Sequence, residues 1–149
     1  MIDPATAFSL AGLLAIAGWL ALLVALFVPA ARPLAWPAAQ LLIPTLLAIA
    51  YGLLLVAGRG AFESGGFGSI DEVRLLFADD RALAAGWLHY LAFDLFVGAW
   101  ISRDGTGRGI PALLLLPCLP LTFLFGPIGL LLYLTIRLAF RPAARKAIR

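Results

Sequence analysis

One carboxylate lies in the middle of a long apolar segment. From Ala82 to Ser102 the chain is apolar except for His89, Tyr90 and Asp94. Asp94 lies about ten residues into this segment, which at about 1.5 Å per helical residue is near the centre of a bilayer. An ionised carboxylate there costs about 2.5–3.5 kcal/mol or more, so Asp94 must face the protein interior, find a partner or stay protonated. A neutral carboxylic acid at this depth is a candidate general acid.

Helical geometry selects the neighbours of Asp94. Tyr90, Asp94 and Gly98 follow one another at intervals of four residues and share one face, with Trp87 beside them. His89, the one histidine of the chain, lies about 140° around the helix from Asp94. The pattern makes Asp94 and the Tyr90 hydroxyl candidates for one shared site, whereas it favours a satisfied core or interfacial role for His89. A lone histidine predicts no metal site, and no motif indicates a cofactor.

A second feature is the run Phe125-Gly126-Pro127-Ile128-Gly129 in the last apolar segment. Pro127 has no N–H and clashes with the carbonyl of Phe123, so we expect a kink and a free carbonyl that needs a donor. A kinked, glycine-lined wall suits a cavity for a rigid ligand, although it also suits ordinary helix packing. The predicted substrate-binding residues are Trp87, Gly98, Phe125, Gly126, Pro127 and Tyr133.

Asp94 also has a structural interpretation. An interhelical hydrogen bond from its carboxyl group would fix the packing of the spans without any chemistry. Candidate partners are Thr45 and Tyr51 in the second apolar segment, and Thr122 and Tyr133 in the fourth.

The composition places these residues in a membrane. Of the 149 residues, 63% are apolar and 13% are charged, against about 45–50% and about 25% in soluble domains. This excess excludes an ordinary soluble protein, a disordered chain and a disulfide-rich secreted scaffold. Cys118 is the one cysteine, and its Leu/Pro-rich surroundings indicate a buried, inert thiol.

The apolar segments predict an all-α polytopic membrane protein. Each is long enough to cross about 30 Å of hydrocarbon as a helix, and none alternates as the strands of a membrane barrel do. We expect one membrane domain over residues 1–149, with four transmembrane helices at about 7–29, 38–57, 82–102 and 112–139.

The second loop predicts a short helix of its own. Ser69 and Glu72 form a capping box, and apolar residues follow at helical spacing. We expect an amphipathic interfacial helix over about 70–78. It is either a connector or a rim through which a lipophilic substrate enters.

The basic residues predict an orientation. With four spans, the second loop and both termini share a side. That side carries Arg59, Arg74, Arg81, Arg137, Arg141, Arg145, Lys146 and Arg149, whereas the other carries Arg32, Arg103 and Arg108. We therefore expect both termini in the cytoplasm, and the Ala/Leu/Arg-rich composition is typical of a bacterial inner-membrane protein. The basic tail, 141–149, can contact anionic lipid head groups, and a net charge of +3 without a basic stripe excludes nucleic acid as a partner.

The stretch from Trp87 to Trp100, followed by the run from Phe125 to Leu131, resembles the neoxanthin-synthase-like family of small membrane proteins, named after the plant abscisic-acid-deficient locus. The resemblance covers about Ser69 to Phe140. It implies a four-span protein of a pigment-bearing membrane. Plant members are implicated in converting violaxanthin to neoxanthin, an isomerisation that opens an epoxide to an allene. An acid would protonate the epoxide oxygen and a base would remove a proton from the polyene.

We therefore expect a membrane protein that binds or modifies a carotenoid-like lipophile, with Asp94, Tyr90 and His89 as the groups to test. The alternative is a non-catalytic accessory or assembly subunit that contacts other membrane proteins, or further copies of itself, through small-residue faces. A small transporter is a third interpretation. The absence of a row of intramembrane charges excludes a voltage sensor or primary pump.

Overall fold

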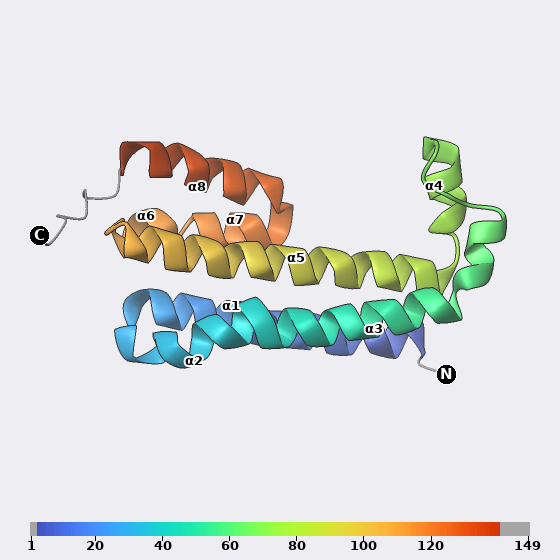
Figure 1. The fold of residues 1–149 in the computed structure, drawn as a ribbon, viewed down its shortest axis with the longest axis horizontal. Coiled ribbons are helices and arrows are strands. Elements are labelled where there is room, and N and C mark those ends of the chain that lie inside the picture. Colours follow the sequence, from blue (N-terminus) through green and yellow to red (C-terminus); the bar gives the residue numbers. More distant parts are fainter. Residues whose placement is uncertain (1–2, 141–149) are drawn as a thin grey trace, which may run out of the picture.

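The computed structural model describes residues 3–140, and all their regular elements are helical (Figure 1). The prediction of an all-α membrane protein is confirmed. The α-helices are α1 (Pro4–Phe27), α2 (Arg32–Pro37), α3 (Ile43–Ala57), α4 (Ile70–Leu76), α5 (Asp80–Gly107), α6 (Ala112–Leu115), α7 (Cys118–Phe125) and α8 (Pro127–Ala139). Short 3₁₀ turns occupy Pro29–Ala31 and Arg59–Glu63, and a π-helical turn occupies Ala38–Leu42.

Helix α1 begins at an N-cap that the sequence supplies. The Asp3 carboxylate accepts hydrogen bonds from the backbone N–H and the hydroxyl of Thr6, at 2.9 and 2.8 Å. These bonds lower the pKa of the Asp3 carboxyl because they favour its charged form. The buried face of α1 carries small side chains, including Ala7, Ala11 and Ala15, which let α5 approach closely.

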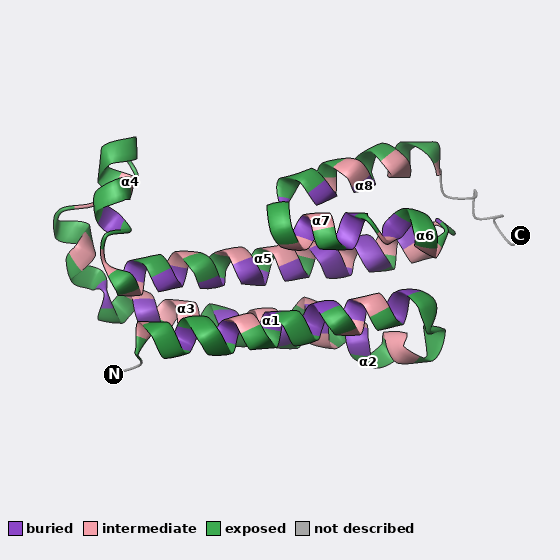
Figure 2. Ribbon diagram, turned by 180° about the vertical axis from the view of Figure 1, so that it is seen from behind, coloured by how far each residue is buried: buried purple, intermediate pink, exposed green. Residues whose placement is uncertain are grey.

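Helix α5 is the centre of the molecule. It packs against α1 and α3 on one side and against α6, α7 and α8 on the other. Its buried positions form continuous stripes, whereas α1 and α3 expose their outer faces (Figure 2). Those outer faces are apolar; Leu13 and Val56, for example, are each 65% exposed. Such a surface suits lipid and not water.

Three helical segments are long and apolar enough to cross a membrane, namely Pro4–Phe27, Pro29–Ala57 and Asp80–Gly107. The second runs through the π-helical turn, so Pro33, Pro37 and Pro44 lie within the segment without ending it. The predicted fourth span is not confirmed. Its residues form two shorter apolar helical stretches, Ala112–Phe125 and Pro127–Ala139.

The last apolar segment reverses at Gly126 instead of kinking. Gly126 has φ +40°, a conformation that favours glycine, and Pro127 then takes the first position of α8. Helices α7 and α8 pack side by side as a hairpin (Figure 1). At Gly129 a Cβ atom would lie 2.2 Å from the backbone nitrogen of Thr122, so only glycine permits this approach.

The reversal changes the topology. The start of α1 and the end of α8 lie at opposite ends of the bundle (Figure 1). The expectation that both termini share one side of the membrane rested on a fourth crossing, which is not confirmed, so that expectation stays a prediction.

The second loop contains the expected short helix. Helix α4 begins after Ser69, whose hydroxyl accepts the N–H of Glu72 at 3.2 Å. The Glu72 carboxylate accepts the N–H of Gly68, at 2.9 Å, instead of that of Ser69. The predicted capping box is therefore present, except that the Glu72 side chain caps the N–H of Gly68, one residue before Ser69.

Candidate functional site

Asp94 points at the break between α7 and α8. Its two carboxylate oxygens lie 2.8 and 3.1 Å from the place that a Cβ atom on Gly126 would take. The carboxyl group thus fills the space left by the missing side chain. It also lies beside the first turn of α8, where the helix dipole favours negative charge.

Tyr90 supplies the hydrogen-bond donor that the sequence predicted for the carbonyl left free by Pro127. Its hydroxyl donates to the carbonyl of Phe123 at 2.6 Å, the carbonyl that Pro127 leaves without a helical N–H. Tyr90 and Asp94 lie one turn apart on α5, and together they contact both sides of the break. We call the group Tyr90, Asp94, Phe123 and Gly126 the break site.

Two buried polar atoms near the break site have no partner among the described residues. One is Oδ2 of Asp94, and the other is Nε1 of Trp19. The Trp19 ring packs against Phe123, with centroids 5.6 Å apart, and covers Gly98, where a Cβ atom would lie 2.4 Å from it. Buried polar groups are nearly always paired, so each unpaired one asks for an explanation such as a ligand.

An aromatic row leads from the break site toward the N-terminal end of α1. Trp87 stacks on Tyr90 and on Phe8, with centroids 5.3 Å apart in both pairs. Phe8 and Trp87 also line a cavity of about 460 Å³ between α1 and α5, beside Asp80.

The other predicted site residues lie elsewhere. His89 is on a different face of α5, where it stacks with Phe93 and faces Tyr51, at centroid distances of 4.6 and 5.8 Å. Phe125 and Pro127 flank the break but are exposed on the outside of the hairpin. Gly98 is closed off by the Trp19 ring. The structure therefore brings together Tyr90, Asp94 and Gly126 from the predicted set, and it leaves the third predicted catalytic group, His89, on another surface.

None of the candidate structural partners of Asp94 bonds to it. The Thr122 hydroxyl donates to the carbonyl of Cys118 at 2.8 Å, and Tyr133 is fully buried beside Asp104. The Cys118 thiol is buried, as expected, and donates to the carbonyl of Leu114 at 3.4 Å.

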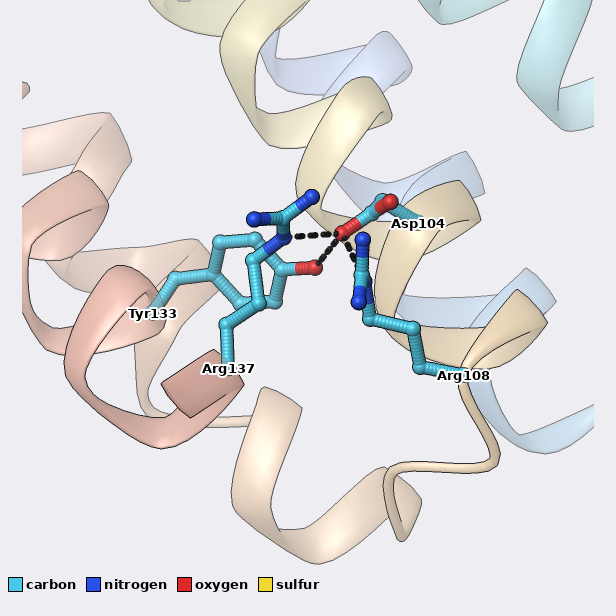
Figure 3. Close-up of polar contacts among 4 residues, drawn as sticks. All are labelled: Asp104, Arg108, Tyr133 and Arg137. Atoms are coloured by element: carbon cyan, nitrogen blue, oxygen red, sulfur yellow. Dashed lines mark hydrogen bonds and ion pairs between the residues drawn. The ribbon is translucent and has the colours of Figure 1, made fainter. Parts of the chain in front are cut away.

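A second carboxylate, Asp104, lies near the C-terminal end of α5 (Figure 3). Its Oδ2 accepts hydrogen bonds from Nε of Arg108 at 2.7 Å, from Nε of Arg137 at 2.8 Å and from the Tyr133 hydroxyl. The Arg137 guanidinium also lies 5.9 Å from the centroid of the Trp100 ring. These bonds join the C-terminal part of α8 to α5 and hold the hairpin in place.

The comparisons with known proteins bear on the chain as a whole. A family model described as "ABA4-like: ABA DEFICIENT 4-like" matches residues 6–133. The chain belongs to the ABA4-like family. This confirms the resemblance seen in the sequence and extends it to the first two apolar segments, where the sequence offered nothing beyond apolarity. No match was found among curated proteins or among solved structures.

The matched region of this ABA4-like protein includes Trp19, Tyr90, Asp94, Gly126 and Asp104. Sequence reasoning missed two of these. Trp19 is one tryptophan in an apolar helix, and nothing local marks it as the residue that covers Gly98. Asp104 follows the apolar run and resembles an ordinary surface charge; its spacing of four residues to Arg108 was the available signal.

Proposed function

We propose that this ABA4-like protein binds a carotenoid-like lipophile at the break site, with Asp94 as the group that contacts a polar atom of the ligand. The observation that carries the proposal is the unpaired, buried Oδ2 of Asp94 beside the reversal at Gly126. The indole N–H of Trp19, on the neighbouring helix α1, is a donor without a partner among residues 3–140. Membership of the family supports a carotenoid-related ligand.

The aromatic row Phe8–Trp87–Tyr90 supports an elongated ligand. Stacked rings offer a flat, apolar surface along which a polyene can lie. The row ends beside Asp94, so a ligand on it would present its ring end to the carboxyl group. Phe8 and Trp87 are 46% and 41% exposed, so this surface is open to a ligand that arrives through the membrane.

The catalytic form of the proposal is an epoxide-to-allene isomerisation. A protonated Asp94 would give its proton to the epoxide oxygen as the C–O bond opens, which leaves a cation on the polyene. The Asp94 carboxylate would then take a proton from a polyene carbon, and the allene forms. The acid is regenerated and the composition is unchanged, so one carboxyl group suffices. With His89 on another face, Tyr90 would position the hairpin through Phe123.

The test uses Asp94→Asn in a host that makes xanthophylls, with pigments extracted and separated by chromatography. We expect loss of the product, and loss of pigment bound to the purified protein if Asp94 also serves binding. The matched control is Asp71→Asn, because Asp71 is an exposed carboxylate of α4. An unchanged pigment profile at normal protein level would exclude the catalytic form.

A non-catalytic accessory subunit remains the second candidate function. The observation that favours it is that His89, one of the three predicted catalytic groups, lies on another face of α5 than the break site. Purification in mild detergent distinguishes the pigment-binding function from the accessory function. A coloured protein without a partner supports the pigment proposal, whereas a colourless protein that retains a stoichiometric membrane partner supports the accessory role.

We also propose that the N-terminus and the C-terminal end of α8 lie on opposite sides of a bacterial inner membrane. The end with Arg32, Arg103, Arg108 and Arg137 would face the cytoplasm under the positive-inside rule. The basic tail continues from this end in the sequence. In this proposal the C-terminus is cytoplasmic, as the sequence predicted, whereas the N-terminus lies outside the cytoplasm.

Cysteine labelling tests this orientation. In a Cys118→Ser background, Ser64→Cys lies at the α4 end and Thr106→Cys at the opposite end. A membrane-impermeant maleimide added to intact cells should label the first and spare the second. The reverse pattern, or equal labelling of both, would contradict the proposal.

A further inference from the structure

The charges of the described chain are divided between the two ends of the bundle. The end that contains the N-terminus and α4, here called the acidic end, carries six carboxylates and three arginines. They are Asp3, Glu63, Asp71, Glu72, Asp79 and Asp80, with Arg59, Arg74 and Arg81. The opposite end, here called the basic end, carries Arg32, Arg103, Arg108 and Arg137 with one carboxylate, Asp104.

At the basic end, Asp104 compensates only part of the positive charge. Asp104 pairs with Arg108 and Arg137. Arg32 and Arg103 have no ion-pair partner among residues 3–140. The Nε of Arg32 donates to the carbonyl of Ala25 at 3.0 Å, which positions the side chain without neutralising it.

Both unneutralised guanidinium groups gather around one tryptophan. The central carbons of Arg32 and Arg103 lie 5.7 and 5.9 Å from the centroid of the Trp36 ring. The Trp36 indole N–H donates to the Ser102 hydroxyl at 3.1 Å, so the ring is fixed to α5. A second contact, from Arg103 to the side-chain oxygen of Gln40, fixes the guanidinium against the π-helical turn.

Trp36, Gln40 and Arg103 border an open cavity of about 530 Å³, and Arg32 lies outside its lining, against the Trp36 ring. Its walls are Trp36 and Gln40 on one side and Trp100, Arg103 and Asp104 on the other. Arg103 lies about nine residues beyond Asp94 along α5, or about 14 Å, so a mid-bilayer Asp94 places the cavity near head-group depth. Tryptophan with arginine at this depth is typical of the membrane interface.

We propose that this cavity binds the phosphate of an anionic phospholipid in the leaflet at the basic end. Arg103 would donate to the phosphate oxygens, and Arg32 would add charge from across the Trp36 ring. Trp36 and Trp100 would pack on the glycerol and the first methylene groups of the acyl chains. The planar guanidinium is well suited to a phosphate because it donates two parallel hydrogen bonds. The occupant is a lipid because the charge, the aromatic pair and the depth coincide at one cavity.

The experiment measures thermal unfolding of the full-length protein in a non-ionic detergent. Phosphatidylglycerol or phosphatidylcholine with the same acyl chains is added, and binding is followed in parallel by native mass spectrometry. We expect Tm to rise with phosphatidylglycerol and not with phosphatidylcholine. Arg103→Gln and Arg32→Gln should each weaken the apparent affinity for phosphatidylglycerol roughly tenfold.

Two controls keep the result specific. Arg59→Gln removes an exposed arginine of the acidic end and should leave the affinity unchanged. Replacing the four basic residues of 141–149 by glutamine should also preserve the difference between the two lipids, since the cavity lies outside the tail. Arg103 is exposed, so its variant should fold even if the Arg32 variant does not.

Three outcomes would overturn the proposal. They are equal stabilisation by both lipids, unchanged affinity in Arg103→Gln, and an equal shift with glycerol phosphate alone. The last would assign a phosphate site without a lipid. None of these outcomes affects the proposed pigment site at Asp94.

Discussion

Asp94 and Asp104 are carboxylates of one helix, ten residues apart, and the protein treats them differently. Asp104 receives two arginines and a tyrosine on a single oxygen. Asp94 has an oxygen that is buried and unpaired. The satisfied carboxylate holds the α7–α8 hairpin to the end of α5, whereas the unsatisfied one lies where the hairpin turns. Asp104 therefore serves the fold, whereas Oδ2 of Asp94 makes no hydrogen bond within residues 3–140.

The largest effect on stability should come from Asp104. Asp104→Ala leaves Arg108, Arg137 and the buried Tyr133 hydroxyl without their acceptor. Loss of one member of a buried ion pair costs about 3–5 kcal/mol, and the partial exposure of these side chains reduces this to about 2–3 kcal/mol. Unfolding in detergent should show the loss. A stability equal to that of the native chain would mean that the cluster does not hold the hairpin.

Gly126→Ala should come next. Alanine at φ +40° is strained, and its methyl group would meet the Asp94 carboxyl; the expected cost is about 2 kcal/mol. Combining it with Asp94→Ala should recover the part of the cost that comes from the contact. Full additivity of the two substitutions would show that the carboxyl group and Gly126 do not touch.

Tyr90→Phe should have a smaller effect. It leaves the Phe123 carbonyl without its donor, and interhelical hydrogen bonds in membranes contribute about 0.6 kcal/mol on average and about 1.7 at most. The amide I band of protein labelled with ¹³C=O at phenylalanine should also shift as one carbonyl loses its bond. An unchanged spectrum would argue against the Tyr90–Phe123 contact.

Asp94→Asn should have the smallest effect on stability, within about 0.5 kcal/mol, or should stabilise slightly. An amide avoids the cost of a carboxylate at the depth predicted for Asp94, and Oδ2 of Asp94 has no hydrogen-bond partner to lose among residues 3–140. The same unfolding measurement applies, run beside the Asp104 variant. A loss of stability as large as that of Asp104→Ala would mean that Asp94 has a structural role. The two carboxylates would then not differ in function.

Much of the break site follows from local sequence. The side-chain period of a helix puts Tyr90 and Asp94 on one face, and the missing N–H of Pro127 leaves the Phe123 carbonyl in need of a donor. Both conclusions follow from the order of residues along the chain, without any knowledge of the tertiary structure. The separation of His89 from Asp94 follows from the same geometry, because five residues of helix turn the two side chains to different faces. Naming both residues as catalytic groups ignored this separation.

The last apolar segment shows where local reasoning ends. A glycine followed by proline in an apolar run fits a kinked span and a hairpin equally well. The choice of the hairpin depends on the contact of Gly129 with Thr122 and on the bonds from Asp104 to Tyr133 and Arg137. These contacts join residues that are far apart along the chain or that meet only after the reversal, so no local pattern contains them.

By itself, the sequence determined that this is a membrane protein built of helices, and it predicted the depth of Asp94 in the bilayer, because apolarity and helical period act over short stretches. The tertiary structure decided the direction of the last helix, and with it the end of the bundle at which α8 finishes. It also decided which carboxylate is satisfied and which arginines gather around Trp36. These depend on long-range packing, in which one positive φ angle reverses thirteen residues of helix.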